Sequence, residues 1–115
     1  MPSRSIQQRL QDILTAAQEI QLFTRDVDRQ TFEQDLRTIR AVLYNFAIIG
    51  EAAASLLPDI EISHPEVPWK DLRGLRNIAI HEYFRVNLDM VWETIIHDLP
   101  FLIDQIQKIQ RTLSD

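Results

Sequence analysis

In AVLYNFAIIGEAAASLL, residues 41–57, apolar side chains spread over most of the circumference of a helix. A helix with such a distribution is typically buried on more than one side. A spacing of three and four residues continues upstream from Leu43 through Ile39, Leu36 and Phe32. This pattern predicts one long helix that is enclosed by other parts of the protein.

The start of this long helix has two candidates. Thr31 is followed three residues later by Gln34, a spacing that resembles a capping box. Asp28 is also a common N-cap residue and would begin the helix about one turn earlier. After the helix, the proline-rich stretch LLPDIEISHPEVPWK predicts the one real loop.

Three further helices are expected. The first covers about residues 4–23, where apolar residues recur at spacings of three and four. Its stripe consists of Ile6, Leu10, Ile13, Leu14, Ala17 and Ile20. The third should cover about residues 69–84 and follows Pro68, whose missing N–H costs nothing at a helix start. The fourth begins after the N-cap Asn87. Its apolar spacing continues without a shift across Pro100, which predicts one long helix kinked at the proline.

These helices predict an all-α protein, an antiparallel four-helix up-and-down bundle that forms a single domain over residues 1–115. The sequence has only two glycines, and no strict apolar-polar alternation is bounded by turn residues. A β-sheet is therefore not expected.

Composition limits the functional classes. The chain has no cysteine, which removes disulfides, thiolate metal sites and a cysteine nucleophile together. The first residues, MPSRSIQQRLQ, lack the apolar core of a signal peptide. No apolar run approaches the ~18 residues of a membrane span, so we expect a cytoplasmic protein without a membrane partner. The net charge of −5 argues against nonspecific coating of nucleic acid, which draws its affinity from many cations.

One segment departs from this acidic average, since residues 70–85 contain four cations and two anions. The segment includes most of LRGLRNIAIHEYFRVN, residues 72–87, in which Arg76, His81 and Tyr83 follow one another. Two interpretations are open at this point. The cations can be a solvated helix end, where the helix dipole favours positive charge, or they can belong to a functional site.

The helical positions of these residues bear on the second interpretation. On an ideal helix Arg76 and Tyr83 lie within about 20° of each other, and Arg73, one turn earlier, shares that side. His81 is about 140° away from Arg76 and diverges from it. The histidine and the arginine converge only if the helix unwinds near Glu82 or if two copies of the chain meet at a twofold cleft.

The chemistry open to histidine and arginine together is well defined. Histidine titrates near neutrality and can move a proton to or from an RNA 2′-hydroxyl or a leaving 5′-oxygen. Arginine donates to phosphate oxygens as charge builds in the transition state. These groups suffice for metal-independent RNA cleavage by internal transesterification. We expect no metal and no other cofactor, because His64, His81 and His97 lie in a loop and in two different predicted helices.

Arg76, Asn77, His81 and Tyr83 fit the pattern R-x-x-x-x-H-x-Y with a polar residue after the arginine, and in this the stretch resembles the HEPN superfamily. The surrounding chain resembles the HepT toxins of that superfamily in particular. The resemblance is carried by IIGEAAASLLPDI, HPEVPWKDLRGLRNIAIHEYF and NLDMVWETIIHDLPFL, and it covers most of residues 40–104.

This resemblance implies a small all-helical homodimer that acts as the RNase toxin of a toxin–antitoxin system, with RNA as its substrate. Arg76 and His81 would carry catalysis at a cleft between two copies, supported by Asn77. Arg73 and Tyr83 would contribute to RNA binding. The implied partner is an antitoxin nucleotidyltransferase of the MNT type, which in this family transfers AMP from ATP to the motif tyrosine, here Tyr83.

Two other functions are compatible with the same residues. The chain could be a catalytically inactive helical module that binds a nucleotidyltransferase, or a plain helical assembly subunit. The acid Glu82, which stands between His81 and Tyr83, either repels RNA or holds His81 protonated.

Overall fold

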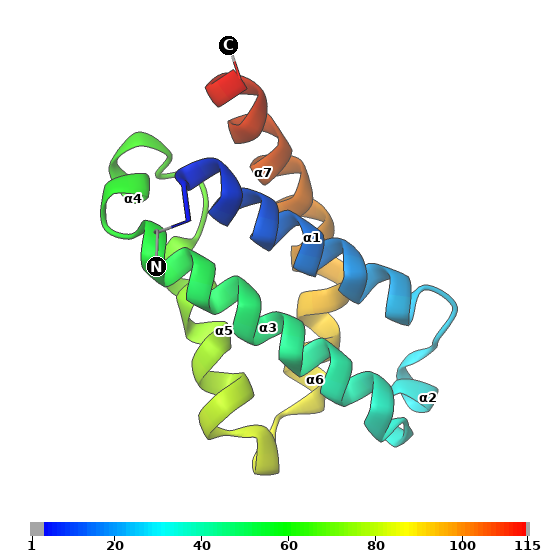
Figure 1. Ribbon diagram of the computed structural model, residues 1–115. Helices are drawn as coiled ribbons and strands as arrows, with labels where there is room; N and C mark the ends of the chain where they lie inside the picture. The colour runs from blue at the N-terminus through cyan, green and yellow to red at the C-terminus, as the bar shows by residue number, and fades with distance from the viewer. Residues whose placement is uncertain (1–3, 115) are drawn as a thin grey trace.

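The computed structural model describes residues 4–114, which form helices and no strand (Figure 1). The elements in chain order are α1 Ile6–Thr24, α2 Arg29–Gln34, α3 Leu36–Leu56, α4 Asp59–Ser63, α5 Trp69–His81, the 3₁₀ turn η1 Tyr83–Arg85, α6 Leu88–Glu93, the π-helical turn η2 Thr94–Asp98 and α7 Leu99–Ser114. The predicted all-α class is confirmed.

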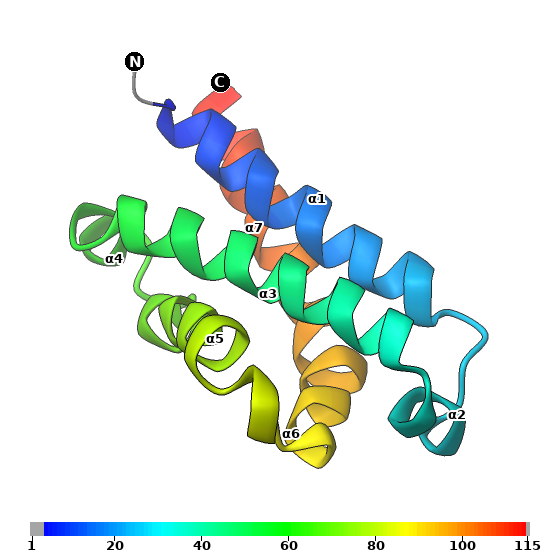
Figure 2. The ribbon, with the colours of Figure 1, turned by 60° about the horizontal axis from the view of Figure 1, so that its bottom comes forward.

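The long helices form the predicted antiparallel bundle with α3 at its centre. α1 packs along one side of α3 and α5 along the other, and α7 lies against α1 (Figure 1, Figure 2). The run of α6, η2 and α7 supplies the fourth member. α5, which carries the motif residues, is therefore attached to the rest of the molecule chiefly through α3.

The core is apolar, and all four members of the bundle contribute to it. Its largest fully buried side chains include Leu10, Ile13, Ile20, Phe32, Phe46, Ile49, Trp69, Leu99 and Ile106. Each stabilises the fold by about 1.5–3 kcal/mol through removal from water. The apolar spacing read from the sequence thus corresponds to packing between helices.

The expectation that no apolar run approaches a membrane span was too strict, because α3 is long and apolar enough to cross a membrane by length and composition, with a mean hydropathy of 1.3. In the bundle, however, 56% of that segment is buried by the protein itself. Its apolar side chains pack against α1 and α5, which is the environment of a core helix.

The predicted second helix is divided into α2 and α3. Asp28 caps α2 by accepting a hydrogen bond from the backbone N–H of Thr31 at 2.8 Å, so the earlier of the two predicted starts is confirmed. A start at Thr31 is wrong, because Thr31 lies inside α2. Asp35 interrupts the helix with φ −103° and ψ 87° and caps α3 by accepting from the N–H and the hydroxyl of Thr38.

Both capping carboxylates have a lowered pKa. The backbone N–H of Thr31 is the main cause for the lowered pKa of Asp28, and the Thr31 side chain adds to it. For Asp35 the hydroxyl of Thr38 lowers the pKa most, followed by its backbone N–H. Each of these donors stabilises the ionised form of the carboxylate.

The segment between α3 and α5 is less irregular than the predicted loop. It contains α4, whose first turn carries Asp59 and Glu61, where the helix dipole favours acids. Trp69 then begins α5, as predicted, and its buried indole N–H donates to the backbone oxygen of His64 at 2.8 Å. This bond fixes the start of the helix that carries the motif.

The fourth run continues across Pro100, as predicted, and Asn87 caps its start by accepting a backbone N–H at 3.2 Å. The departure from α-helical geometry lies just before the proline, in η2. There Leu99 donates its backbone N–H to the oxygen of Thr94, five residues back. The predicted kink thus takes the form of a π turn, which widens the helix where a proline ring would crowd the preceding turn.

Candidate functional site

α5 packs tightly against α3 where Arg76 meets Gly50. A β-carbon added to Gly50 would lie 2.5 Å from the backbone nitrogen of Arg76 and 2.6 Å from its β-carbon. Only glycine avoids this collision, since it has no side chain. Gly50 therefore sets the distance between the two helices at the position of the motif arginine. No local pattern in the sequence indicates this role for Gly50, because the contact exists only in the folded chain.

The side chain of Arg76 is held by the residue after that glycine. Its Nη1 lies 2.8 Å from Oε2 of Glu51, and the two side chains are 51% and 55% exposed. An ion pair so exposed adds at most about 1 kcal/mol to stability, so its main consequence is the orientation of the guanidinium. Glu51 was also missed in the sequence, where an acid in a helix carries no sign of its partner.

Four of the predicted site residues share one hollow on the outer face of α5. The hollow is lined by Lys70, Arg73, Gly74, Arg76, Asn77 and His81. None of the described residues that line it has a carboxylate. The structure thus brings Arg73, Arg76, Asn77 and His81 to one positively charged surface. Arg76 also borders a second hollow, over α3, with Tyr44, Glu51 and Ile80 among its lining residues.

His81 is the last residue of α5 and is exposed. The helix ends there because Glu82 departs from helical geometry, with φ −122° and ψ 13°. The predicted extent to Phe84 is therefore too long, and the unwinding considered at Glu82 is present. Among the described residues no hydrogen bond or ion pair joins His81 to Arg76, although both line the same hollow.

Tyr83 lies outside this hollow, on η1. Its ring sits 5.7 Å from the guanidinium carbon of Arg40 on α3, and the residue is 53% exposed. Tyr83 and Arg76 thus contact the same face of α3, because their partners Arg40 and Glu51 are eleven residues apart, about 20° around the helix and about 16 Å along it. The predicted shared face of one helix is not formed, because α5 ends at His81 and Tyr83 lies on η1. The two residues are instead separated along α3.

The charge of Glu82 is directed toward a neighbour on its own turn. Its Oε1 lies 3.7 Å from Nη2 of Arg85, and it has no such contact with His81 in the part of the chain that the structure describes. The positive charge of Arg85 thus partly neutralises the negative charge of Glu82, which follows His81 at the edge of the basic hollow.

The other histidines have separate surroundings. His64 lies 3.6 Å from the carboxylate of Glu66 and His97 lies 3.1 Å from that of Glu93. Within residues 4–114 no group of three or more histidine, aspartate or glutamate side chains could hold a metal ion.

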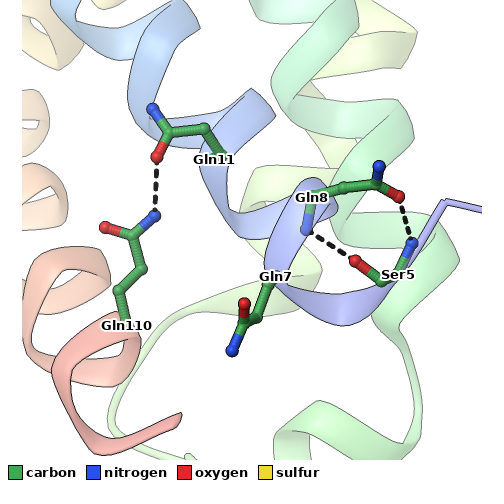
Figure 3. A pocket seen from close by; sticks show the side chains of 5 residues that line it. All are labelled: Ser5, Gln7, Gln8, Gln11 and Gln110. Atoms are coloured by element: carbon green, nitrogen blue, oxygen red, sulfur yellow. Dashed lines mark hydrogen bonds between the residues drawn. The ribbon is translucent and has the colours of Figure 1, made fainter. Parts of the chain in front are cut away.

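A further hollow lies between the start of α1 and the end of α7 and is lined by Ser5, Gln7, Gln8, Gln11 and Gln110 (Figure 3). Ser5 and Gln8 form the capping box of α1. The side-chain amide of Gln110 donates to that of Gln11 at 3.0 Å. These amides tie the two helices together, and they offer neither a titratable group nor a cation for catalysis.

Comparison with known proteins adds independent information. The family model described as "Ribonuclease HepT-like" matches residues 13–109. A protein of Thermococcus cleftensis named "Probable ribonuclease HepT" is 35% identical over 94% of this chain and 98% of its own length. A protein of Methanocaldococcus jannaschii named "Putative RNase" is 36% identical over 100% of this chain and 99% of its own length. No solved structure matches the chain.

Proposed function

This chain belongs to the HepT-like ribonuclease family, and on that premise we propose that it is a metal-independent endoribonuclease, the toxin component of a toxin–antitoxin system. The proposal is carried by the hollow on α5, which gathers Arg73, Arg76, Asn77 and His81 without a carboxylate among its described lining residues. Such a surface suits the phosphates of RNA, because guanidinium groups donate to phosphate oxygens in a fixed fork.

The proposed reaction is internal transesterification of RNA. The 2′-oxygen bonds to the adjacent phosphorus and its proton passes to a base, while the bond from phosphorus to the 5′-oxygen breaks and that oxygen takes up a proton. The products are a 2′,3′-cyclic phosphate and a 5′-hydroxyl. His81 moves one of these protons, and Arg76 stabilises the charge that builds on the phosphoryl oxygens. Asn77 supports them as an amide donor beside Arg76.

The active form in this proposal is a homodimer. The surface over α3 and α5 next to Arg76 includes apolar side chains that are open to solvent, with Tyr44 68% and Ile80 46% exposed. Adjoining apolar side chains of this kind favour association. A twofold axis through this surface would bring a second Arg76 and a second His81 to one cleft, and thereby supply the convergence that a single chain lacks.

Tyr83 is the proposed target of a partner nucleotidyltransferase of the MNT type. The phenolic oxygen would bond to the α-phosphorus of ATP, its proton would pass to a base, and pyrophosphate would leave. The exposure of Tyr83 and the guanidinium of Arg40 over its ring support this assignment, because the new phosphate would gain a cationic neighbour. The bulky, negatively charged group would then exclude RNA from the cleft.

The deciding experiment is cleavage of labelled RNA in EDTA by purified chain whose intact mass shows an unmodified Tyr83. Wild type should leave 2′,3′-cyclic phosphate ends, and Arg76→Ala and His81→Ala should abolish cleavage. His97→Ala is the matched control, since His97 is also an exposed histidine but pairs with Glu93 and lies outside the hollow. Absence of cleavage by the unmodified wild type would instead favour the catalytically inactive module that binds a nucleotidyltransferase.

A further inference from the structure

α5 contains a glycine that no contact within the described chain explains. Gly50 on α3 is required by the backbone of Arg76, whereas a β-carbon added to Gly74 would meet no atom within 4 Å among the described residues. Glycine inside a helix is less stable than alanine, because it loses more backbone freedom on folding. Gly74 therefore has a cost to the fold without a compensating contact in one chain.

The position of Gly74 connects it to the basic hollow. Lys70, Gly74, Asn77 and His81 follow one another at spacings of four, three and four residues and form one stripe along α5. Gly74 is the position in the middle of this stripe that has no side chain. At that point an occupant of the hollow can rest against the helix backbone, with Lys70 on one side along the stripe and Asn77 on the other.

The positive charge of the hollow favours a negatively charged occupant. Lys70, Arg73 and Arg76 line it, and the described lining residues include no acid. Lys70 is only loosely paired, with its Nζ 3.9 Å from the carboxylate of Glu61, and Arg73 forms no ion pair with the described residues. These two cations are available to a polyanion, and the phosphates of a nucleic acid strand are a polyanion with charges at regular spacing.

We propose that the phosphate backbone of an RNA strand lies directly against α5 at Gly74, between Lys70 and Asn77. This subsite rests on the proposed function for the identity of the polyanion, and it extends the site by one turn beyond the catalytic pair. Lys70 and Arg73 bind phosphates next to the reacting one, and the missing side chain at Gly74 lets the strand approach closely enough for both.

A second copy of the chain is the competing occupant. Gly74 also borders an apolar groove between α5 and the fourth run, whose lining includes Leu75, Ile78 and Phe101. A partner helix in that groove would use the same glycine. The two occupants differ in their charge and in their effect on oligomeric state, so one set of variants separates them.

The test is binding of fluorescein-labelled 2′-O-methyl oligouridylate to the full chain in EDTA, because this probe lacks the 2′-hydroxyl and cannot be cleaved by transesterification. Gly74→Ala should raise Tm by about 4 °C through better helix propensity and weaken binding about threefold. Gly74→Leu, with the fold verified by circular dichroism, should weaken binding at least tenfold while the oligomeric state stays that of wild type.

Salt dependence identifies the phosphate contacts. Lys70→Gln and Arg73→Gln should each reduce the slope of log K against log salt by about 0.7, the value for one phosphate on a single strand. Lys108→Gln on α7, equally exposed at 68% and distant in the chain, should leave the slope unchanged.

Two results would overturn the subsite. One is unchanged affinity in Gly74→Leu, and the other is a change of oligomeric state in that variant, which would assign Gly74 to contact between copies. The probe cannot be cut, so binding and cleavage are tested separately. If the chain binds the probe in the predicted way but leaves RNA intact, the proposed ribonuclease activity is refuted and the proposed RNA-binding subsite stands.

Discussion

The backbone nitrogen of Arg76 lies 2.5 Å from the point where Gly50 would carry a β-carbon. Gly50→Ala must therefore push α5 away from α3 and should destabilise the fold by about 1–3 kcal/mol, as overpacking of a core does. Denaturant unfolding measures this loss. Gly74→Ala is the matched control, because it adds the same methyl group on α5 in open space and should stabilise the protein by up to about 1 kcal/mol. Equal stability of Gly50→Ala and wild type would contradict the close crossing.

Glu51 acts on the reaction through Arg76, as a positioning residue. In Glu51→Gln the guanidinium loses its charged partner at 2.8 Å and becomes free to turn. We expect single-turnover cleavage to slow about tenfold, an effect of misorientation, while RNA affinity stays equal or rises, because an acid beside the site has been removed. Stability should change by no more than about 1 kcal/mol. A variant with unchanged cleavage rate would show that the ion pair has no positioning role.

The capping carboxylates make stability depend on pH. Hydrogen bonds from Thr31 and Thr38 lower the folded-state pKa of Asp28 and Asp35, so both groups stabilise the fold above the unfolded value of about 3.9. This contribution should be lost as pH falls through the lowered pKa of each group. Urea unfolding between about pH 6 and pH 2 measures the loss.

Asn replacements supply the control for this pH dependence. Asp35→Asn keeps a cap acceptor for α3 but cannot titrate, so its unfolding midpoint should fall less steeply with acid than that of wild type. The same holds for Asp28→Asn and α2. If Asp35→Asn and Asp28→Asn had the same acid profile as wild type, the caps would not contribute to the pH dependence.

Much of the fold could be predicted because it depends on local spacing. Apolar residues at helical intervals define the bundle members, and Asn87 and Pro68 mark helix starts that the structure confirms. The break at Asp35 was missed because the apolar spacing continues across it. Its signal was nevertheless present, since Asp35 precedes Thr38 by the three residues that an N-cap bond requires.

The site was predictable only as far as one helix extends. The spacing of Arg76, Asn77 and His81 on α5 was readable, and all three line one hollow. The contacts that place the arginine come from Gly50 and Glu51, some 25 residues earlier on α3, and no local pattern links positions so far apart. The predicted helix extended to about residue 84 because apolar and aromatic residues continue beyond His81, although unwinding near Glu82 was one of the alternatives that the sequence left open.

The proposed cleft between two copies predicts complementation. The cleft would hold two catalytic pairs. If each pair combines Arg76 from one copy with His81 from the other, a mixed dimer of Arg76→Ala and His81→Ala chains has one intact pair and one that lacks both groups. Either variant alone should be inactive, whereas an equimolar mixture should regain about a quarter of wild-type activity, since half of the dimers are mixed and each has one of its two catalytic pairs intact.

Native mass spectrometry must first show that the two variant chains exchange to form mixed dimers. As a separate control, Ile80→Arg should prevent dimer formation. Ile80 is a 46% exposed apolar side chain on the surface next to Arg76, so a charge there should separate the copies and abolish cleavage while the helical fold persists. A mixture that exchanges its subunits but stays inactive would mean that Arg76 and His81 act within one chain. The reaction would then take place in the hollow on α5 that both residues of a single chain line.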